Sequence, residues 1–284
     1  MGMKKLYLFF VLSVFFVPFT VTGQENVLDG LFEKGHVANR KPIPYVHVRE
    51  ADVLWSKTVW RVIDLREKMN LSLYYPTTSF DGRFSLISLL MQGVQFGQLT
   101  AYSAKTDDEF KVRLKMDDVL QELGASSDTQ SVRNATTGLY EQKIVTGDVR
   151  TDQVKQFLVK EVWFFDRNYS RMDVRIIGLC PIREYVREEG GDGEVIRKPL
   201  FWVYFPEARP LLASHEVFNP KNDAIRYTFD DVFNKRYFGS YIYRESNVFN
   251  NRQIDQYTAG MEAMLEAERI KNDLYNKEHD MWEF

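Results

Sequence analysis

Alternation of apolar and polar residues in the middle of the chain constrains the fold more than any other feature. The run "FLVKEVWFF" has apolar residues at alternating positions, namely Phe157, Val159, Trp163 and Phe165. A turn, "DRNYS", follows, and the next run alternates through Met172, Val174, Ile176, Gly178, Cys180 and Ile182. Two such runs joined by a short turn predict an antiparallel hairpin. The later run "PLFWVYF" is apolar on both sides and predicts a central strand. We therefore expect an antiparallel β-meander, packed with helices on either side of it in sequence, in an α+β fold.

The first residues have the composition of a secretory leader. Lys4 and Lys5 precede an apolar run from Leu6 to Val17, and small residues follow up to Gly23. We expect residues 1–23 to be a cleavable signal peptide; a membrane anchor, the alternative, would need about 20 apolar residues. A lipid anchor would require a cysteine just after the cleavage point, and the single cysteine is Cys180. We therefore expect a soluble exported protein.

The charge balance argues against nucleic acid as a partner. The chain has 37 basic and 40 acidic residues, a net charge of −3. The leader holds two of the basic residues and none of the acidic ones, so its removal makes the net charge −5. Nucleic acids and anionic membranes attract clustered lysine and arginine, which this sequence lacks. One cysteine also excludes an internal disulfide.

Residues 24–284 are predicted to form one α+β domain. The stretch "GASSDTQSVRNATTG", Gly124–Gly138, is rich in serine, threonine and asparagine and lacks periodicity. We interpret it as a surface loop. A domain boundary at this loop is the alternative.

A long amphipathic helix is predicted from Gln256 to about Trp282. Its apolar residues cover more than half of the helix circumference: Tyr257, Met261, Met264, Leu265, Ile270, Leu274, Tyr275, Met281 and Trp282. A stripe of this width is either buried between several elements of the same chain or completed by another subunit.

The segment "VLWSKTVWRVIDLREKM", Val53–Met69, is also predicted to be a helix. At 100° per residue, one half of it collects the residues Leu54, Trp55, Val59, Val62, Ile63, Leu65 and Met69. Val53 and Trp60 lie on the opposite side, near Lys57 and Asp64. A large aromatic residue inside a charged rim is typical of a binding hot spot, so we predict an inter-subunit contact. Coverage of Trp60 by another part of the same chain is the alternative.

The sequence contains no familiar catalytic or metal-binding motif. The four histidines are far apart, and neither H-E-x-x-H, G-x-S-x-G nor a Walker loop is present. Cys180 could act as a nucleophile with His47 or His215 as its base, but its strand position favours a buried core cysteine. Glu161 and Asp173 could serve a secreted hydrolase or a carbohydrate-binding module, which is the alternative function; neighbouring arginines favour a simple charge ladder. We expect no enzymatic activity, metal or cofactor.

Several long segments resemble the gliding motility protein N family, GldN/PorN, of the type IX secretion system of Bacteroidetes. They include "IPYVHVREADVLWSKTVWRVIDLREKMN", "DVRIIGLCPI", "LFWVYFPEARPLLASHEVFNPKNDA" and "LEAERIKNDLYNKEHDMWEF". The similarity runs from about Asn26 to the C-terminus. These long motifs are far more specific than any short pattern.

The resemblance implies a structural subunit of a periplasmic ring at the inner face of the outer membrane. It implies association with the lipoprotein GldK/PorK, with further copies of the chain, and with the periplasmic part of GldM/PorM. It implies no catalytic or cofactor-binding residues. Together with the patterns of the two predicted helices, it leads to the candidate interface residues Val53, Lys57, Trp60, Asp64, Met264, Tyr275 and Trp282.

Overall fold

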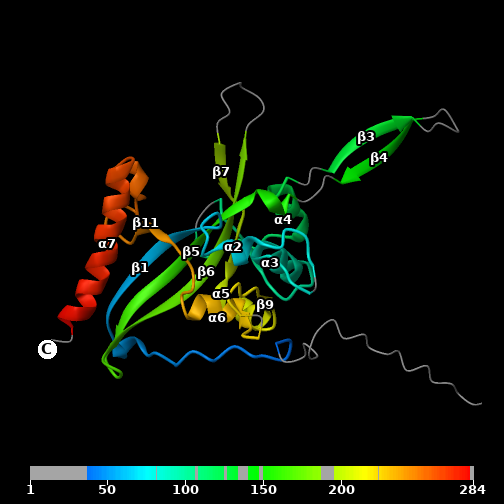
Figure 1. The fold of residues 1–284 in the computed structure, drawn as a ribbon. Coiled ribbons are helices and arrows are strands. Elements are labelled where there is room, and N and C mark those ends of the chain that lie inside the picture. Colours follow the sequence, from blue (N-terminus) through cyan, green and yellow to red (C-terminus); the bar gives the residue numbers. More distant parts are fainter. Residues whose placement is uncertain are drawn as a thin grey trace, which may run out of the picture. The chain divides into compact units, whose positions relative to one another are not determined.

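The computed structural model describes residues 37–281, except 81, 106–107, 125–126, 134–139, 147–149, 187–194 and 223. Its main element is a seven-stranded antiparallel sheet in the order β11-β1-β5-β6-β8-β2, with β7 paired to β6 (Figure 1). The strands are β1 (Val53–Asp64), β2 (Ala101–Ser103), β5 (Val154–Asp166), β6 (Arg171–Val186), β7 (Val195–Pro199), β8 (Phe201–Tyr204) and β11 (Tyr241–Glu245). β5 and β6 form the predicted hairpin. The α+β prediction is therefore confirmed.

In the described part of the chain, six α-helices accompany the sheet (Figure 1). They are α2 (Leu71–Tyr74), α3 (Leu86–Gln95), α4 (Met116–Glu122), α5 (Phe205–Ala213), α6 (Phe229–Asn234) and α7 (Met261–Asp280). Short 3₁₀ turns lie at Glu50–Asp52 (η1), Thr151–Gln153 (η2) and Ile254–Gln256 (η3), and a small second sheet pairs β9 (Glu216–Val217) with β10 (Tyr227–Thr228). α6 starts with a capping box, because the Thr228 hydroxyl accepts the Asp231 N–H at 3.1 Å.

The helix predicted for Val53–Met69 is wrong, because most of this segment is β1. Seven of the 12 residues in β1 are Val, Ile, Thr or Trp, the types that favour strands. β5 pairs along the strand on one side, and β11 pairs with its second half on the other. These two partners supply the backbone hydrogen bonds that a helix would have made internally. Leu54 and Met69, which were expected to point inward, are exposed.

Strand alternation divides the side chains of the sheet between two faces. On one face, Ile63 lies opposite Phe157 and both are fully buried in the main core under the helices α3, α5 and α6. Each such side chain stabilises the fold by roughly 1.5–3 kcal/mol through removal from water. Further along the same face, Val59 and Trp163 form a second cluster against α7. All the large helices therefore pack on one face of the central strands.

The stretch Gly124–Gly138, which was predicted to be a loop, contains the strand β3 (Ser127–Arg133). β3 pairs antiparallel with β4 (Tyr140–Thr146), with Ser127 opposite Thr146. The sequence of β3 lacks apolar alternation, but antiparallel backbone pairing does not require it. The predicted signal peptide, residues 1–23, and the start of the expected mature chain lie outside the described residues.

Candidate interaction surface

Trp60 is not an outward-facing anchor, and the prediction that it is exposed on one copy of the chain is wrong. Its side chain is only 3% exposed and packs with Cys180 and Trp202. The physical reason is the strand period of two. Val59 points toward α7, so its neighbour Trp60 points to the opposite face of the sheet. There it is covered by side chains from the same chain, including Tyr102 and Phe110.

Charged side chains do surround Trp60, but they form part of its cover. The Arg244 guanidinium carbon lies 3.9 Å from the ring centroid, and the Lys160 ammonium lies 5.6 Å from it. Asp108 holds both cations, at 2.6 Å from Arg244 and 3.7 Å from Lys160. Cations over an indole face are attracted by the ring quadrupole. This layer makes Trp60 part of the folded core.

The other candidates on β1 do not form a common patch. Lys57 makes an ion pair with Glu245 at 2.7 Å on the α7 side of the sheet, whereas Asp64 lies on the same face as Trp60. Burial opposes the ionisation of Asp64, but hydrogen bonds from Arg66 and Gln156 outweigh it and lower the pKa to about 2. Val53 is partly buried at the start of the strand. These side chains have structural partners within the chain.

α7 is an amphipathic helix with one buried stripe. Ala267, Ile270 and Leu274 pack against the sheet cluster that contains Val59 and Trp163. The helix begins after Gly260, whose positive φ of 61° suits glycine. The ion pairs of Arg269 with residues three positions before and four positions after it stabilise the exposed side.

A second group of apolar side chains on α7 is exposed, and the exposed Glu268 and Asn272 lie between them on the same side of the helix. Its exposed fractions are 77% for Met261, 75% for Met264, 64% for Leu265 and 50% for Tyr275. At 100° per residue these four side chains span an arc of about 100°. The wide apolar stripe of the sequence thus has two parts: one packs on the sheet and the other remains open. Met264 and Tyr275 were among the predicted residues, while Trp282 lies outside the described part of the chain.

An exposed turn beside β11 carries two more apolar residues, Val248 and Phe249, which are 90% and 65% exposed. Asn247 holds this turn, because its side-chain oxygen accepts the N–H groups of Phe249 and Arg252 at 3.0 and 3.2 Å. The Arg252 guanidinium lies over the rings of Phe249 and Tyr257. Sequence reasoning missed this turn. The signal available was an apolar pair flanked by asparagines, "NVFNN", since asparagine tolerates turn conformations.

The hydroxyl of Tyr257 connects this turn to α7 by donating to Glu266 at 3.2 Å. We call the combined set the α7 surface; it consists of Val248, Phe249, Met261, Met264, Leu265 and Tyr275. Methionine and aromatic residues are enriched in protein–protein interfaces. The hydrogen-bonded turn and the regular helix fix these side chains on rigid elements, which lowers the entropic cost of binding.

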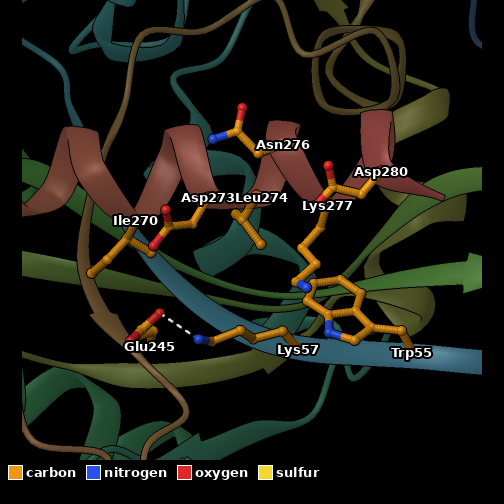
Figure 2. A pocket seen from close by; sticks show the side chains of 9 residues that line it. All are labelled: Trp55, Lys57, Glu245, Ile270, Asp273, Leu274, Asn276, Lys277 and Asp280. Atoms are coloured by element: carbon orange, nitrogen blue, oxygen red, sulfur yellow. Dashed lines mark ion pairs between the residues drawn. The ribbon is translucent and has the colours of Figure 1, made fainter. Parts of the chain in front are cut away.

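A groove of about 330 Å³ lies between α7 and the strands β1 and β11 (Figure 2). Its lining is mixed apolar and charged: Trp55, Lys57, Glu245, Ile270, Asp273, Leu274, Asn276, Lys277 and Asp280. In Figure 2, Lys277 reaches down from the helix toward the indole of Trp55. The predicted residue Lys57 lines this groove, so it lies close to α7 even though Trp60 does not.

Glu161 and Asp173 do not form a pair that could carry out acid–base chemistry. Glu161 lies opposite Ile176 and Asp173 lies opposite Phe164, so the two carboxylates are on different faces of the sheet. Glu161 is fully buried and accepts hydrogen bonds from Arg61, Arg236 and Trp163. Burial alone would raise the pKa of Glu161, but the two guanidinium groups lower it below its usual value. The geometry therefore gives no support to a hydrolase or carbohydrate site here.

Cys180 is a core residue, as its strand position predicted. It is fully buried, and this burial raises the pKa of its thiol.

Among the described residues, no group of three or more His, Cys, Asp and Glu side chains could hold a metal ion. Within the same part of the chain, no helix combines the length and apolar character needed to cross a membrane.

The fold is α+β, and the α7 surface leaves large apolar side chains exposed on a regular helix and a hydrogen-bonded turn. Over residues 48–283 the sequence matches the family described as gliding motility associated protein GldN. The chain therefore belongs to the GldN family and is a gliding motility-associated protein. This match confirms the resemblance found in the sequence. A comparison with curated proteins gives no match.

Proposed function

We propose that this protein is a non-enzymatic structural subunit of the periplasmic ring of the type IX secretion and gliding motility machinery. The observation that carries the proposal is the α7 surface in a member of the GldN family. A helix that leaves four large apolar side chains exposed on its outer side is suited to contact with other proteins. The subunit would act by assembling with neighbours and thereby support protein export.

The proposed partners follow from the family and from the expected leader. An outer-membrane lipoprotein similar to GldK/PorK would hold the ring at the inner face of the outer membrane. Further copies of the chain would complete the ring, and the periplasmic part of a GldM/PorM-like protein would contact it. Ring closure requires two different patches on each subunit. The α7 surface is our candidate for one of the contact patches of the subunit.

Co-purification from solubilised outer membranes tests this proposal. The full chain is expressed with its lipoprotein partner, and the lipoprotein is captured. We expect the chain to elute with the lipoprotein as a large oligomer. The proposal would be contradicted if the chain elutes as a monomer without the lipoprotein and also does not bind the lipoprotein when it is present.

A further inference from the structure

The charges around the exposed stripe of α7 indicate what kind of partner it fits. The helix contains six acidic and three basic residues, a net charge of −3 with His279 neutral. Two of the basic side chains are already engaged within the helix. Arg269 bridges Glu266 and Asp273, at 2.6 Å from each, and Lys271 pairs with Glu268 at 3.0 Å. An excess of negative charge therefore remains on the exposed side of this helix, where Glu268 lies among the apolar residues.

The excess negative charge is concentrated on one flank of the stripe. At 100° per residue, Glu262 and Asp280 both lie about 100° from Met261, next to the acids that Arg269 bridges. No described residue makes an ion pair with Glu262 or Asp280. The exposed apolar residues Met261, Met264 and Leu265 lie within about one helical turn, and Tyr275 follows about 15 Å further along the same side, because a helix rises 1.5 Å per residue.

We propose that the α7 surface docks a basic amphipathic helix of a partner protein. The apolar face of that helix would cover Met264 and Leu265, and its lysine or arginine flank would lie along Glu262 and Asp280. Opposite charges at the rim of such a contact accelerate association and fix its orientation. The proposal rests on the assembly role proposed above, to which it adds the chemistry of the partner.

Two other occupants are disfavoured by the same charges. A second copy of α7 would bring two helices of net charge −3 together, and like charges across an interface are unfavourable. An anionic bilayer would be repelled in the same way, since lipid surfaces attract basic and not acidic helices. A basic amphipathic helix can cover the exposed apolar residues with its apolar face and pair its lysine or arginine side chains with the acidic flank.

Two synthetic peptides of about 18 residues test the proposal, because this length spans the stripe. Both carry leucine on one helical face; one has lysine on its flanks and the other has glutamate. Binding of each labelled peptide to the full chain is measured by fluorescence anisotropy at low and high salt. We expect the lysine peptide to bind at least about tenfold more tightly than the glutamate peptide, with the difference reduced by salt screening.

Matched variants locate the binding site. The double variant Met264→Gln with Leu265→Gln should weaken binding of the lysine peptide about tenfold, because glutamine keeps the helix but removes the apolar contact. Leu54→Gln with Met69→Gln, a control at two exposed positions elsewhere, should leave binding unchanged. Glu262→Lys with Asp280→Lys should weaken the lysine peptide and strengthen the glutamate peptide.

Several results would overturn the proposal. The first is equal binding of the two peptides, and the second is unchanged binding of the lysine peptide to the Met264 and Leu265 variant. The third is a dimer of the unmodified chain that is lost in this variant. The fourth is binding of the chain to phosphatidylglycerol vesicles. Thermal unfolding of each variant shows whether it is folded. If the chain co-purifies with its lipoprotein but fails these peptide tests, the assembly role stands and the partner chemistry inferred for α7 is wrong.

Discussion

The guanidinium of Arg244 lies over the indole of Trp60, with its carbon 3.9 Å from the ring centroid. Asp108 accepts a hydrogen bond from Arg244 at 2.6 Å and so holds the cation in place. Phe110, from the same loop as Asp108, packs above Gly178, where an added Cβ would lie 2.5 Å from its ring. The loop after β2 therefore closes the face of the sheet that Trp60 occupies.

Trp60→Ser is predicted to destabilise the single folded chain. Removal of a buried tryptophan typically costs about 3–5 kcal/mol, because it loses apolar burial and leaves a cavity. Urea unfolding of the purified chain measures the loss. Leu54→Ser on the same strand is the control, since Leu54 is exposed and should change the free energy of unfolding little. Equal stability of the Trp60 and Leu54 variants would refute the buried position of Trp60.

Glu161→Gln is predicted to be more damaging than its small change in size suggests. The carboxylate balances Arg61 and Arg236 between the two apolar clusters on the helix-covered face. Without it, these guanidinium groups lose their charge partner, and breaking a buried ion pair costs about 3–5 kcal/mol. Chemical denaturation gives the value. A loss below about 1 kcal/mol would mean that the buried carboxylate is not needed.

Asp64 is predicted to contribute to acid sensitivity. Its pKa falls from 3.8 to about 2 in the folded chain. A carboxylate whose pKa is lower in the folded chain stabilises the fold at pH values above its pKa in the unfolded chain. This stabilisation is lost as the pH falls from about 4 to 2. Asp64→Asn should flatten the dependence of stability on pH in that window, measured by thermal unfolding. Asp117→Asn, at an exposed helix position, serves as the control; identical pH profiles for both variants would count against the shift.

Cys180 is predicted to be inert toward thiol reagents in the folded protein. The side chain is fully buried and its pKa is raised, so little thiolate forms and no reagent reaches it. Because the chain has one cysteine, Ellman's reagent reports on this position alone. Reaction should begin only when denaturant unfolds the chain. Rapid stoichiometric labelling under native conditions would show that the strand β6 is accessible.

The β5–β6 hairpin could be predicted from sequence because each strand alternates regularly and a clear turn joins the two. β1 was misinterpreted because its apolar residues fit a period of 3.6 as well as a period of two. Only pairing with β5 and β11 decides between them, and such long-range pairing is not visible in one segment. Because the segment is a strand with a period of two and not a helix, Trp60 points into the core and not to the surface.

The α7 surface was predictable in part. The width of its apolar stripe, which includes Met264 and Tyr275, already indicated that one neighbour could not cover it all. The structure was needed to show which residues pack on the sheet and which stay open. Val248 and Phe249 were missed because two apolar residues in a polar turn produce no periodic signal. Their exposure depends on the hydrogen bonds of Asn247.

Site-specific photo-crosslinking in cells tests the assembly role most directly. A photoreactive residue replaces Met264 in one strain and Met69, which is also exposed, in another. We expect crosslinking at position 264 to join the chain to another protein of the secretion machinery, with little product at position 69. Absence of any crosslinked partner at position 264 in an assembled, exporting cell would contradict a contact role for the α7 surface.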